Sequence, residues 1–378
     1  MGLGNGIGVP FSRIGGGGGV LPFTIIIDTS LTTGDGFILP IDNTTQDGTI
    51  DWGDSSTSDL SYANRSHTYA SGGIYTITIT AEILKGFRFN GAADRLKLTN
   101  IVAWGAMNIT NGNKAFQNCS NLNISATDAP TVSTIDFQYI FSNCDAITTP
   151  DLSGWDVSGV TKMQESFSYS LLFNGNVSNW VHSSVYHIKR MFRSCPQFNQ
   201  DLSGWDVSGV TNWEEAFYGC GSFNGSVASW VLQGNMSEAF QYCGSFTGTG
   251  VETWNTSAVT SIYRTFSDTA VFNGNVSGWN TGNITNANRA FYNADSFDQD
   301  LSAWVVPQMN LHEFMRDSTG LSTANYDALL IAWDAQGAMT WTGTANFGGS
   351  KYTSGGTAAA ARTSLISKWG GITDGGAA

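Results

Sequence analysis

The chain has 378 residues, of which 17 are Lys or Arg and 30 are Asp or Glu, so its formal net charge is −13. Clustered Lys and Arg bind nucleic acids and anionic membranes, and this acidic chain without a basic block is expected to bind neither. No apolar run reaches the roughly 18 residues of a spanning helix, so membrane insertion is not expected either.

Residues 1–20 are rich in glycine and include the run from Gly15 to Gly19. The segment has neither the basic start nor the apolar stretch of a secretory signal peptide. It cannot bury enough apolar surface to fold alone, so one interpretation is a flexible leader or a remnant of cloning. The other interpretation is an anchor that becomes ordered only in an assembly.

Residues 21–95 contain the elements of a small all-β sandwich. Apolar and polar residues alternate from Ile74 to Thr80, which predicts a half-buried strand. The carboxylates of Asp51 and Asp54 stand in a turn where they can accept backbone N–H groups, and cation binding by them stays open. Together with Ser66-His-Thr-Tyr-Ala, these segments resemble a PKD-type (polycystic kidney disease) module. Residues 96–109 would form a short, rigid link between this module and the rest of the chain.

An internal repeat of about 25 residues dominates the rest of the chain. Its marker is a recurring phenylalanine: Phe116, Phe141, Phe167, Phe192, Phe217, Phe240, Phe266, Phe291 and Phe314. All five cysteines lie three residues after one of these markers: Cys119, Cys144, Cys195, Cys220 and Cys243. An odd number of cysteines at one repeated position predicts a buried ladder of free thiols and not a disulfide framework.

A tryptophan recurs with the same period, always three residues after Leu or Val: Trp155, Trp180, Trp205, Trp230, Trp254, Trp279 and Trp304. Stacked repeats place equivalent residues on one another, so these rings and markers such as Phe167, Phe192 and Phe217 are predicted to form a buried structural spine. A ligand-stacking platform is the alternative, but the strict coupling to an aliphatic residue is what packing requires.

Each repeat is predicted to contain a short helix and a short strand. Val160, Met163 and Phe167, with the cysteine position that follows, match one face of an amphipathic helix of about ten residues. The Asn- and Gly-rich segment after it, such as Phe198–Trp205, predicts a strand that pairs in parallel with its neighbours. The expected fold is an α/β solenoid of leucine-rich-repeat type over residues 96–320.

Charged residues stand two positions before most markers: Lys114, Glu165, Arg190, Glu215, Glu238, Arg264 and Arg289. They are expected to form a solvent-exposed ridge with ion pairs between neighbouring coils. Such exposed pairs contribute only about 0–1 kcal/mol each, so they would serve register and solubility.

The repeat from Phe192 to Phe217, with its segment Asp201-Leu-Ser-Gly-Trp205, resembles the BspA-like leucine-rich-repeat surface proteins over about residues 112–320. The resemblance implies a bacterial or phage surface protein that acts in adhesion and is not an enzyme. The coil that begins at Phe217 is two residues short, which predicts a local kink.

Residues 321–378 are predicted to form a helical cap over the last coil. Thr323 is the expected N-cap of a helix, and four apolar residues that follow it lie on one face of that helix: Tyr326, Leu329, Leu330 and Trp333. A second helix is expected from about Thr357 to Lys368, with Gly370 and Gly371 as its stop.

No pattern indicates catalysis. The histidines His67, His182, His187 and His312 lack metal-ligand spacing, so neither a metal nor a cofactor is expected. The sequence also lacks a phosphate-binding loop and a Gly-x-Ser-x-Gly nucleophile elbow. The chain is therefore predicted not to be an enzyme and to have no catalytic residues.

Two functional interpretations remain. The first is a phage virion protein, such as a tail fibre or appendage adhesin, that mediates host-cell attachment. It is favoured because extracellular-type modules follow Met1 without an export signal, and its leader would contact other virion proteins. The alternative is a secreted bacterial surface adhesin that binds host protein or polysaccharide. The receptor is expected to be a surface glycan or protein, and homo-oligomer formation stays open.

Four tyrosines stand one or two residues after a marker, among Asn, Gln and Ser: Tyr169, Tyr218, Tyr242 and Tyr292. Such a mixture can stack on sugar rings and hydrogen-bond their hydroxyls, so these are the candidate binding residues. The alternative is that the rings merely cover neighbouring coils.

Overall fold

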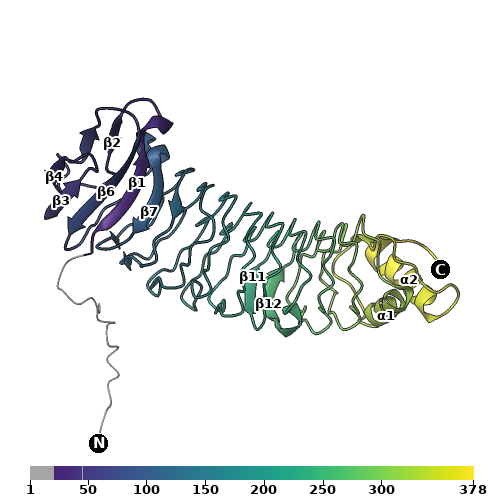
Figure 1. The fold of residues 1–378 in the computed structure, drawn as a ribbon. Coiled ribbons are helices and arrows are strands. Elements are labelled where there is room, and N and C mark those ends of the chain that lie inside the picture. Colours follow the sequence, from purple (N-terminus) through teal and green to yellow (C-terminus); the bar gives the residue numbers. More distant parts are fainter. Residues whose placement is uncertain (1–20, 45) are drawn as a thin grey trace, which may run out of the picture.

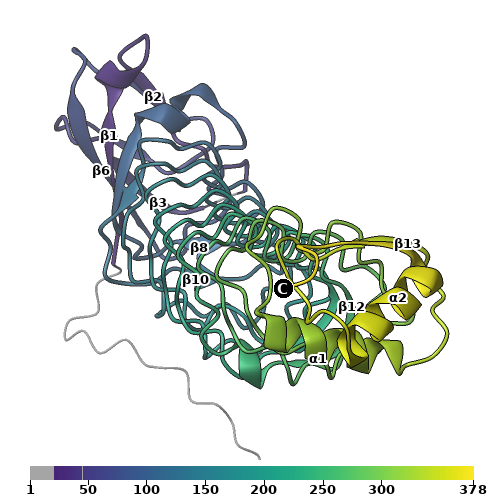
Figure 2. The same cartoon turned by 90° about the vertical axis from the view of Figure 1, so that its right-hand side faces the viewer.

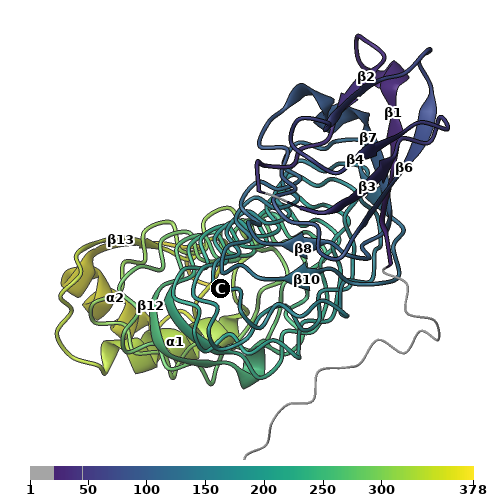
Figure 3. The ribbon, with the colours of Figure 1, turned by 90° about the vertical axis from the view of Figure 1, so that its left-hand side faces the viewer.

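The computed structural model describes residues 21–44 and 46–378, and the predicted leader or anchor over residues 1–20 lies outside them. An all-β end, a long column of stacked coils and a helical end follow one another along the chain (Figure 1). Figures 2 and 3 show the coils lying over one another. Within these described residues, no helix is long and apolar enough to cross a membrane.

The N-terminal end contains a six-stranded sheet in the order β4-β3-β6-β1-β7-β9 and a two-stranded sheet of β2 and β5. The strands are β1 (Phe23–Asp28), β2 (Gly36–Ile38), β3 (Gly48–Asp51), β4 (Thr57–Asp59), β5 (Ser66–Thr68), β6 (Ile74–Ala81), β7 (Leu98–Ala103) and β9 (Asn123–Ile124). Short 3-10 helices are η1 (Thr29–Leu31) and η2 (Ala93–Lys97). The strand predicted from alternation is confirmed as β6, in which Ile77 and Ile79 are buried.

The sheet continues into the column of coils without a separate linker. Strand β7 pairs antiparallel with β1 and parallel with β9, which belongs to the first coil. The carboxylate of Asp128 accepts hydrogen bonds from the backbone N–H groups of Trp104 and Gly105, at 2.9 and 2.7 Å. The region expected to be a link is therefore part of the sheet and is fixed to the coil that comes after it.

The expected α/β solenoid with a helix in every coil is wrong. Only two α-helices occur in the described chain, α1 (Thr323–Asp334) and α2 (Thr357–Trp369), and both lie after the coils. The predicted helical segment of each coil is instead a run of turns. At alternate residues, the main-chain N–H donates to the carbonyl of the residue three positions earlier, as from Ser166 to Met163 and from Ser170 to Phe167.

Backbone conformation explains why no helix forms. The other N–H groups of the segment bond to carbonyls of the next coil, as in Glu165 to Lys189, Phe167 to Met191 and Tyr169 to Arg193. Residues two before and two after each marker from Phe116 to Phe291 have positive φ, such as +53° at Glu165 and +61° at Tyr169. An α-helix tolerates neither this conformation nor the loss of its internal hydrogen bonds.

The predicted parallel pairing occurs, but mostly at other positions. It consists of single bridges five residues before the marker, such as Lys162 with His187, and of short strands. These strands are β8 (Asn108–Ile109) with β10 (Thr131–Val132), and β11 (Val231–Asn235) with β12 (Asn255–Ser261). The pair β11 and β12 lies in the irregular coils after Phe217, where the sequence predicts a kink, and η3 (Val251–Thr253) precedes β12.

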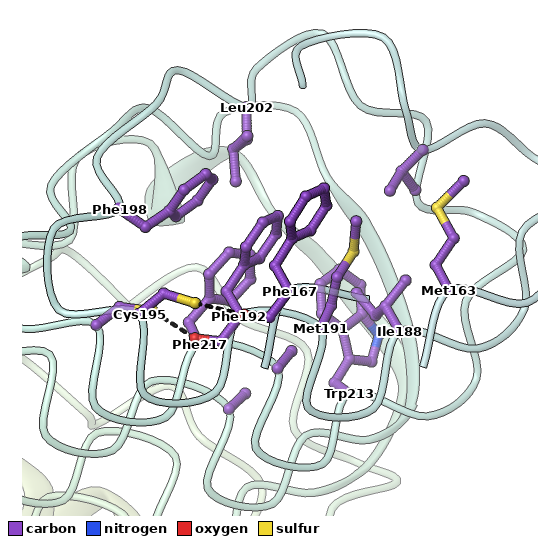
Figure 4. Close-up of a cluster of buried hydrophobic side chains, with 14 of the residues drawn as sticks. Met163, Phe167, Ile188, Met191, Phe192, Cys195, Phe198, Leu202, Trp213 and Phe217 are labelled. Carbon is purple, nitrogen blue, oxygen red and sulfur yellow. Dashed lines mark hydrogen bonds between the residues drawn. The ribbon is translucent and has the colours of Figure 1, made fainter. Parts of the chain in front are cut away.

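Stacked aromatic rings fill the column (Figure 4). Neighbouring marker rings lie 5.2 to 5.9 Å apart and stack from Phe116 to Phe291. A second ladder, six residues after the markers, joins Phe173, Phe198, Phe223, Phe246, Phe272 and Phe297 at 5.6 to 6.0 Å. The ninth marker is not Phe314: the ladder bond from Phe291 N–H to the Phe314 carbonyl places Met315 in the marker position.

The thiol ladder is confirmed. All five cysteines are free and buried, and burial raises the pKa of each, that of Cys195 to about 12. The Cys195 thiol donates to the carbonyl of Phe167 one coil earlier, at 2.9 Å (Figure 4). Ser170 occupies the same repeat position and donates to Phe141 at 2.7 Å. The position therefore takes a small residue, since Ala294 occupies it in a later coil and is buried as well.

The helical end contains both predicted helices, although the N-cap of α1 is Ser322 and not the predicted Thr323. Tyr326, Leu329, Leu330 and Trp333 are the buried residues of α1, and the indole of Trp333 donates to the Leu301 carbonyl at 2.8 Å. Helix α2 ends at Gly370, whose φ of +109° is left-handed. Strands β13 (Gly343–Asn346) and β14 (Gly370–Thr373) pair in parallel beside the helices.

Candidate binding face

The four candidate tyrosines lie outside the aromatic core. Tyr169 and Tyr242 stand two residues after their markers and are 39% and 47% exposed. Tyr218 and Tyr292 stand one residue after theirs and are partly exposed. The backbone beneath the first two is fixed, because each N–H donates to a carbonyl of the next coil: Tyr169 to Arg193, and Tyr242 to Ser267.

Three of the tyrosines and one arginine form a continuous chain of contacts. The guanidinium of Arg193 lies 5.5 Å from the ring centroid of Tyr169 and 5.3 Å from that of Tyr218. Tyr218 in turn meets Tyr242 edge to face at 5.2 Å. An ion pair of 2.9 Å with Glu215 holds Arg193 in place. We call Tyr169, Arg193, Tyr218 and Tyr242 the tyrosine–arginine face.

Tyr292 and Tyr242 line the same hollow. The hollow has a volume of about 270 Å³ and is lined by Gln241, Tyr242, Arg264, Ser267, Asp268, Arg289 and Tyr292. The Tyr292 hydroxyl donates to Asp317 at 2.6 Å, which raises the pKa of Tyr292. The predicted binding residues are therefore brought to one side of the coils, with three in a chain of contacts and the fourth lining a hollow that it shares with Tyr242.

The charged positions pair between coils as predicted but are less exposed than a solvent ridge. Arg190 meets Glu215 at 2.6 Å and Glu165 at 3.9 Å, and Arg264 meets Glu238 at 3.9 Å. The hydrogen bond to Glu215 raises the pKa of Arg190, and partial burial raises that of Glu238. Glu215 itself is buried. These charges therefore border the tyrosine–arginine face as an ordered network.

The seven predicted spine tryptophans, and with them Phe167, Phe192 and Phe217, are buried. From Trp180 to Trp304, each indole N–H donates to the carbonyl of the Leu or Val 27 or 28 residues earlier, at 2.7 to 3.1 Å. Rings placed in this way present no stacking platform to a ligand.

The described part of the chain holds no group of three or more His, Cys, Asp or Glu residues that could bind a metal. In the N-terminal turn, Asp51 accepts the N–H of Gly53, and Asp54 accepts the N–H of Ser56. Asp54 also meets His67 at 2.8 Å, and its hydrogen bonds with Ser56 and His67 lower its pKa to about 2. The role predicted for these carboxylates as acceptors of backbone N–H groups is confirmed.

Arg193 and the left-handed residues beneath the face were not predicted from the sequence. A signal for the latter was present, because Asn, Asp or Gly recurs two residues after the marker, at Asn118, Asn143, Gly219, Asp268 and Asn293. These residue types adopt positive φ most readily. Arg193 carries no such signal, since its role depends on which rings the neighbouring coils place beside it.

The family described as "Mycoplasma protein of unknown function, DUF285" matches residues 87–150, 135–235 and 232–327. These segments cover more than half of the chain, so the chain belongs to this family. No curated protein matches the chain. No solved structure matches it either.

Proposed function

We propose that the protein is a non-enzymatic attachment protein that binds a glycan or protein on a cell surface through the tyrosine–arginine face. The continuous contact from Tyr169 through Arg193 and Tyr218 to Tyr242 carries this proposal. Tyrosine and arginine dominate the energetics of binding surfaces, because both combine a large flat contact area with hydrogen-bonding groups.

The coils supply a rigid support for this face. Backbone hydrogen bonds to the next coil fix Tyr169 and Tyr242, and Glu215 fixes Arg193. A receptor therefore meets side chains whose conformational freedom is already reduced, which lowers the entropic cost of binding.

We propose that the protein is part of a phage virion, as a tail fibre or appendage adhesin. The resemblance of the repeat to BspA-like surface proteins supports a role in adhesion. A bacterial surface adhesin is the second candidate, favoured by the description of the family as a Mycoplasma protein. Immunogold labelling of purified particles and of intact cells separates the two, since the label should decorate only one of them.

The proposal is tested by binding of the purified, fluorescently labelled chain to intact cells of the host. The Tyr218→Ser/Tyr242→Ser double variant removes two rings of the face that are not part of the buried core. We expect at least about a tenfold loss of bound protein, because hot-spot residues carry most of the binding energy. The urea midpoint of unfolding should stay close to that of the parent chain.

Tyr62 and Tyr186 provide a matched control, because they are 48% and 37% exposed. Tyr62 lies between β4 and β5 of the N-terminal end, and Tyr186 stands six residues before its marker, whereas the tyrosines of the face follow theirs. A Tyr62→Ser/Tyr186→Ser variant should bind cells like the parent. The proposal fails if the face variant binds normally, if both double variants lose binding equally, or if the loss follows a drop in stability.

A further inference from the structure

The first tryptophan of the spine, Trp155, lacks the hydrogen bond that the later spine tryptophans make. From Trp180 to Trp304, each indole donates to a carbonyl one coil earlier, but Nε1 of Trp155 is buried and has no hydrogen-bond partner. By the spacing of the ladder, its acceptor would be the carbonyl of residue 127. The chain holds Thr127 and Pro130 where later coils hold an aliphatic residue and a tryptophan.

A hollow of about 630 Å³ lies at this break in the spine. Two consecutive coils line it, with residues 124–129 on one side and residues 149–151 and 153–155 on the other. Its volume lies within the range of small-molecule sites, roughly 300–1,000 Å³. Thr127 and Trp155 both line it, and the Trp155 ring itself is buried at 2% exposure, with Trp104 packed edge to face against it at 5.1 Å.

We propose that this hollow binds a neutral saccharide. Ala129, which is half-buried, and the methyl groups of the exposed Thr127 and Thr149 can pack against the C–H face of a sugar ring. Hydroxyl groups of Thr127 and Ser153 and the carboxylate oxygens of Asp128 and Asp151 can hydrogen-bond the sugar hydroxyls.

The charges of the site favour a neutral ligand. No Lys or Arg lines the hollow, so an anionic sugar would meet Asp128 and Asp151 without a compensating cation. Neither carboxylate needs a cation from the ligand. Asp128 accepts two backbone N–H groups, and Asp151 accepts the N–H and the hydroxyl of Ser153, which lowers the pKa of Asp151.

This site does not depend on the tyrosine–arginine face. It is lined by the segment that precedes the spine tryptophan, whereas the face follows the marker phenylalanines of later coils. A chain that has lost cell binding through the face variant would still bind saccharide in the hollow.

Gly154 offers a way to close the hollow without disturbing the fold. It is exposed, its φ is not left-handed, and a Cβ there would meet no atom within 4 Å. Gly278 is the matched control, because it also directly precedes a spine tryptophan, is exposed and leaves a Cβ equally free. A tyrosine at residue 154 lies at the rim of the hollow, and one at residue 278 does not.

The test is saturation-transfer NMR and calorimetry of the full chain with maltotriose, cellotriose and chitotriose. At least one of these should bind the parent and the Gly278→Tyr variant with equal affinity and bind Gly154→Tyr at least about tenfold more weakly. The indole N–H resonance of Trp155, assigned with a Trp155→Phe variant, should shift as the sugar is added.

Three outcomes overturn the proposal. In the first, none of the three saccharides binds the parent chain. In the second, the saccharide binds the Gly154→Tyr variant as tightly as it binds the parent chain. In the third, only a trilysine peptide or a triuronic acid binds, which would assign the hollow to a charged ligand.

Discussion

Replacing Trp205 by alanine is expected to lower the free energy of unfolding by about 3–5 kcal/mol. Trp205 is 4% exposed, and its ring centroid lies 6.2 Å from that of Trp230 and 6.1 Å from that of Phe192. Its Nε1–H donates to the Val177 carbonyl at 3.0 Å. Alanine removes the ring and leaves a cavity that the neighbouring rings cannot fill, because their own stacking fixes them.

A Trp205→Phe variant separates the ring from its hydrogen bond. It keeps an aromatic ring between the coils but loses the bond to Val177, whose net contribution is about 0.5–1.5 kcal/mol. Trp155 is the internal control, since its Nε1 has no partner. Trp155→Phe should therefore cost less than Trp205→Phe, by about the value of one hydrogen bond.

Equilibrium unfolding in urea, followed by fluorescence of the remaining tryptophans, measures these differences. The reasoning is refuted if Trp205→Ala unfolds within about 1 kcal/mol of the parent. It is also refuted if Trp155→Phe proves the more costly of the two phenylalanine variants.

Gly219 has a φ of +73° at a position that Asn occupies in other coils. Gly219→Asn should therefore leave the free energy of unfolding nearly unchanged, whereas Gly219→Val should lower it by about 1–2 kcal/mol. Equal urea midpoints for the two variants would contradict this. Burial and the raised pKa of Cys195 predict that no thiol of the folded chain reacts with iodoacetamide at neutral pH, while all five react in urea; mass spectrometry that finds a labelled thiol in the folded chain would refute it. Hydrogen bonds from Ser208 lower the pKa of Asp206 in the folded chain. The ionised carboxylate therefore stabilises the fold at pH values above the pKa of the unfolded chain, and this contribution is lost as the pH falls through the lower pKa of the folded chain. Asp206→Asn keeps the acceptor and removes the titration, so it should lose less stability than the parent between about pH 4 and pH 2; equal acid slopes of the urea midpoint would count against this account.

The repeat period and the marker, cysteine and tryptophan positions of the core could be predicted from the sequence, because a stack of coils places buried residues at fixed intervals. The second ladder from Phe173 to Phe297 was missed. Whether a coil contains a helix could not be predicted. Spacing such as that of Val160, Met163, Phe167 and Ser170 shows which side chains point inward, and both a helix and a run of turns satisfy it. The left-handed residues at Glu165 and Tyr169 decide between them, and neither residue type indicates positive φ by itself.

The candidate binding residues were predictable in position but not in arrangement. The step after each marker places Tyr169, Tyr218 and Tyr242 away from the core, which follows from the inward direction of the marker. Their connection through Arg193 depends on which side chains of successive coils become neighbours. The hollow lined in part by Thr127 and Trp155 was missed for a related reason, because it depends on how two consecutive coils lie against each other.

The coils built from turns support both the tyrosine–arginine face and the hollow, so backbone conformation is the property to measure. Cα chemical shifts of the deuterated, isotope-labelled chain report it residue by residue. Within residues 21–44 and 46–378, we predict continuous helical shifts over α1 and α2 alone and non-helical shifts over residues 160–170 and their equivalents in the other coils. Continuous helical shifts through Glu165, Phe167 and Tyr169 would contradict the account.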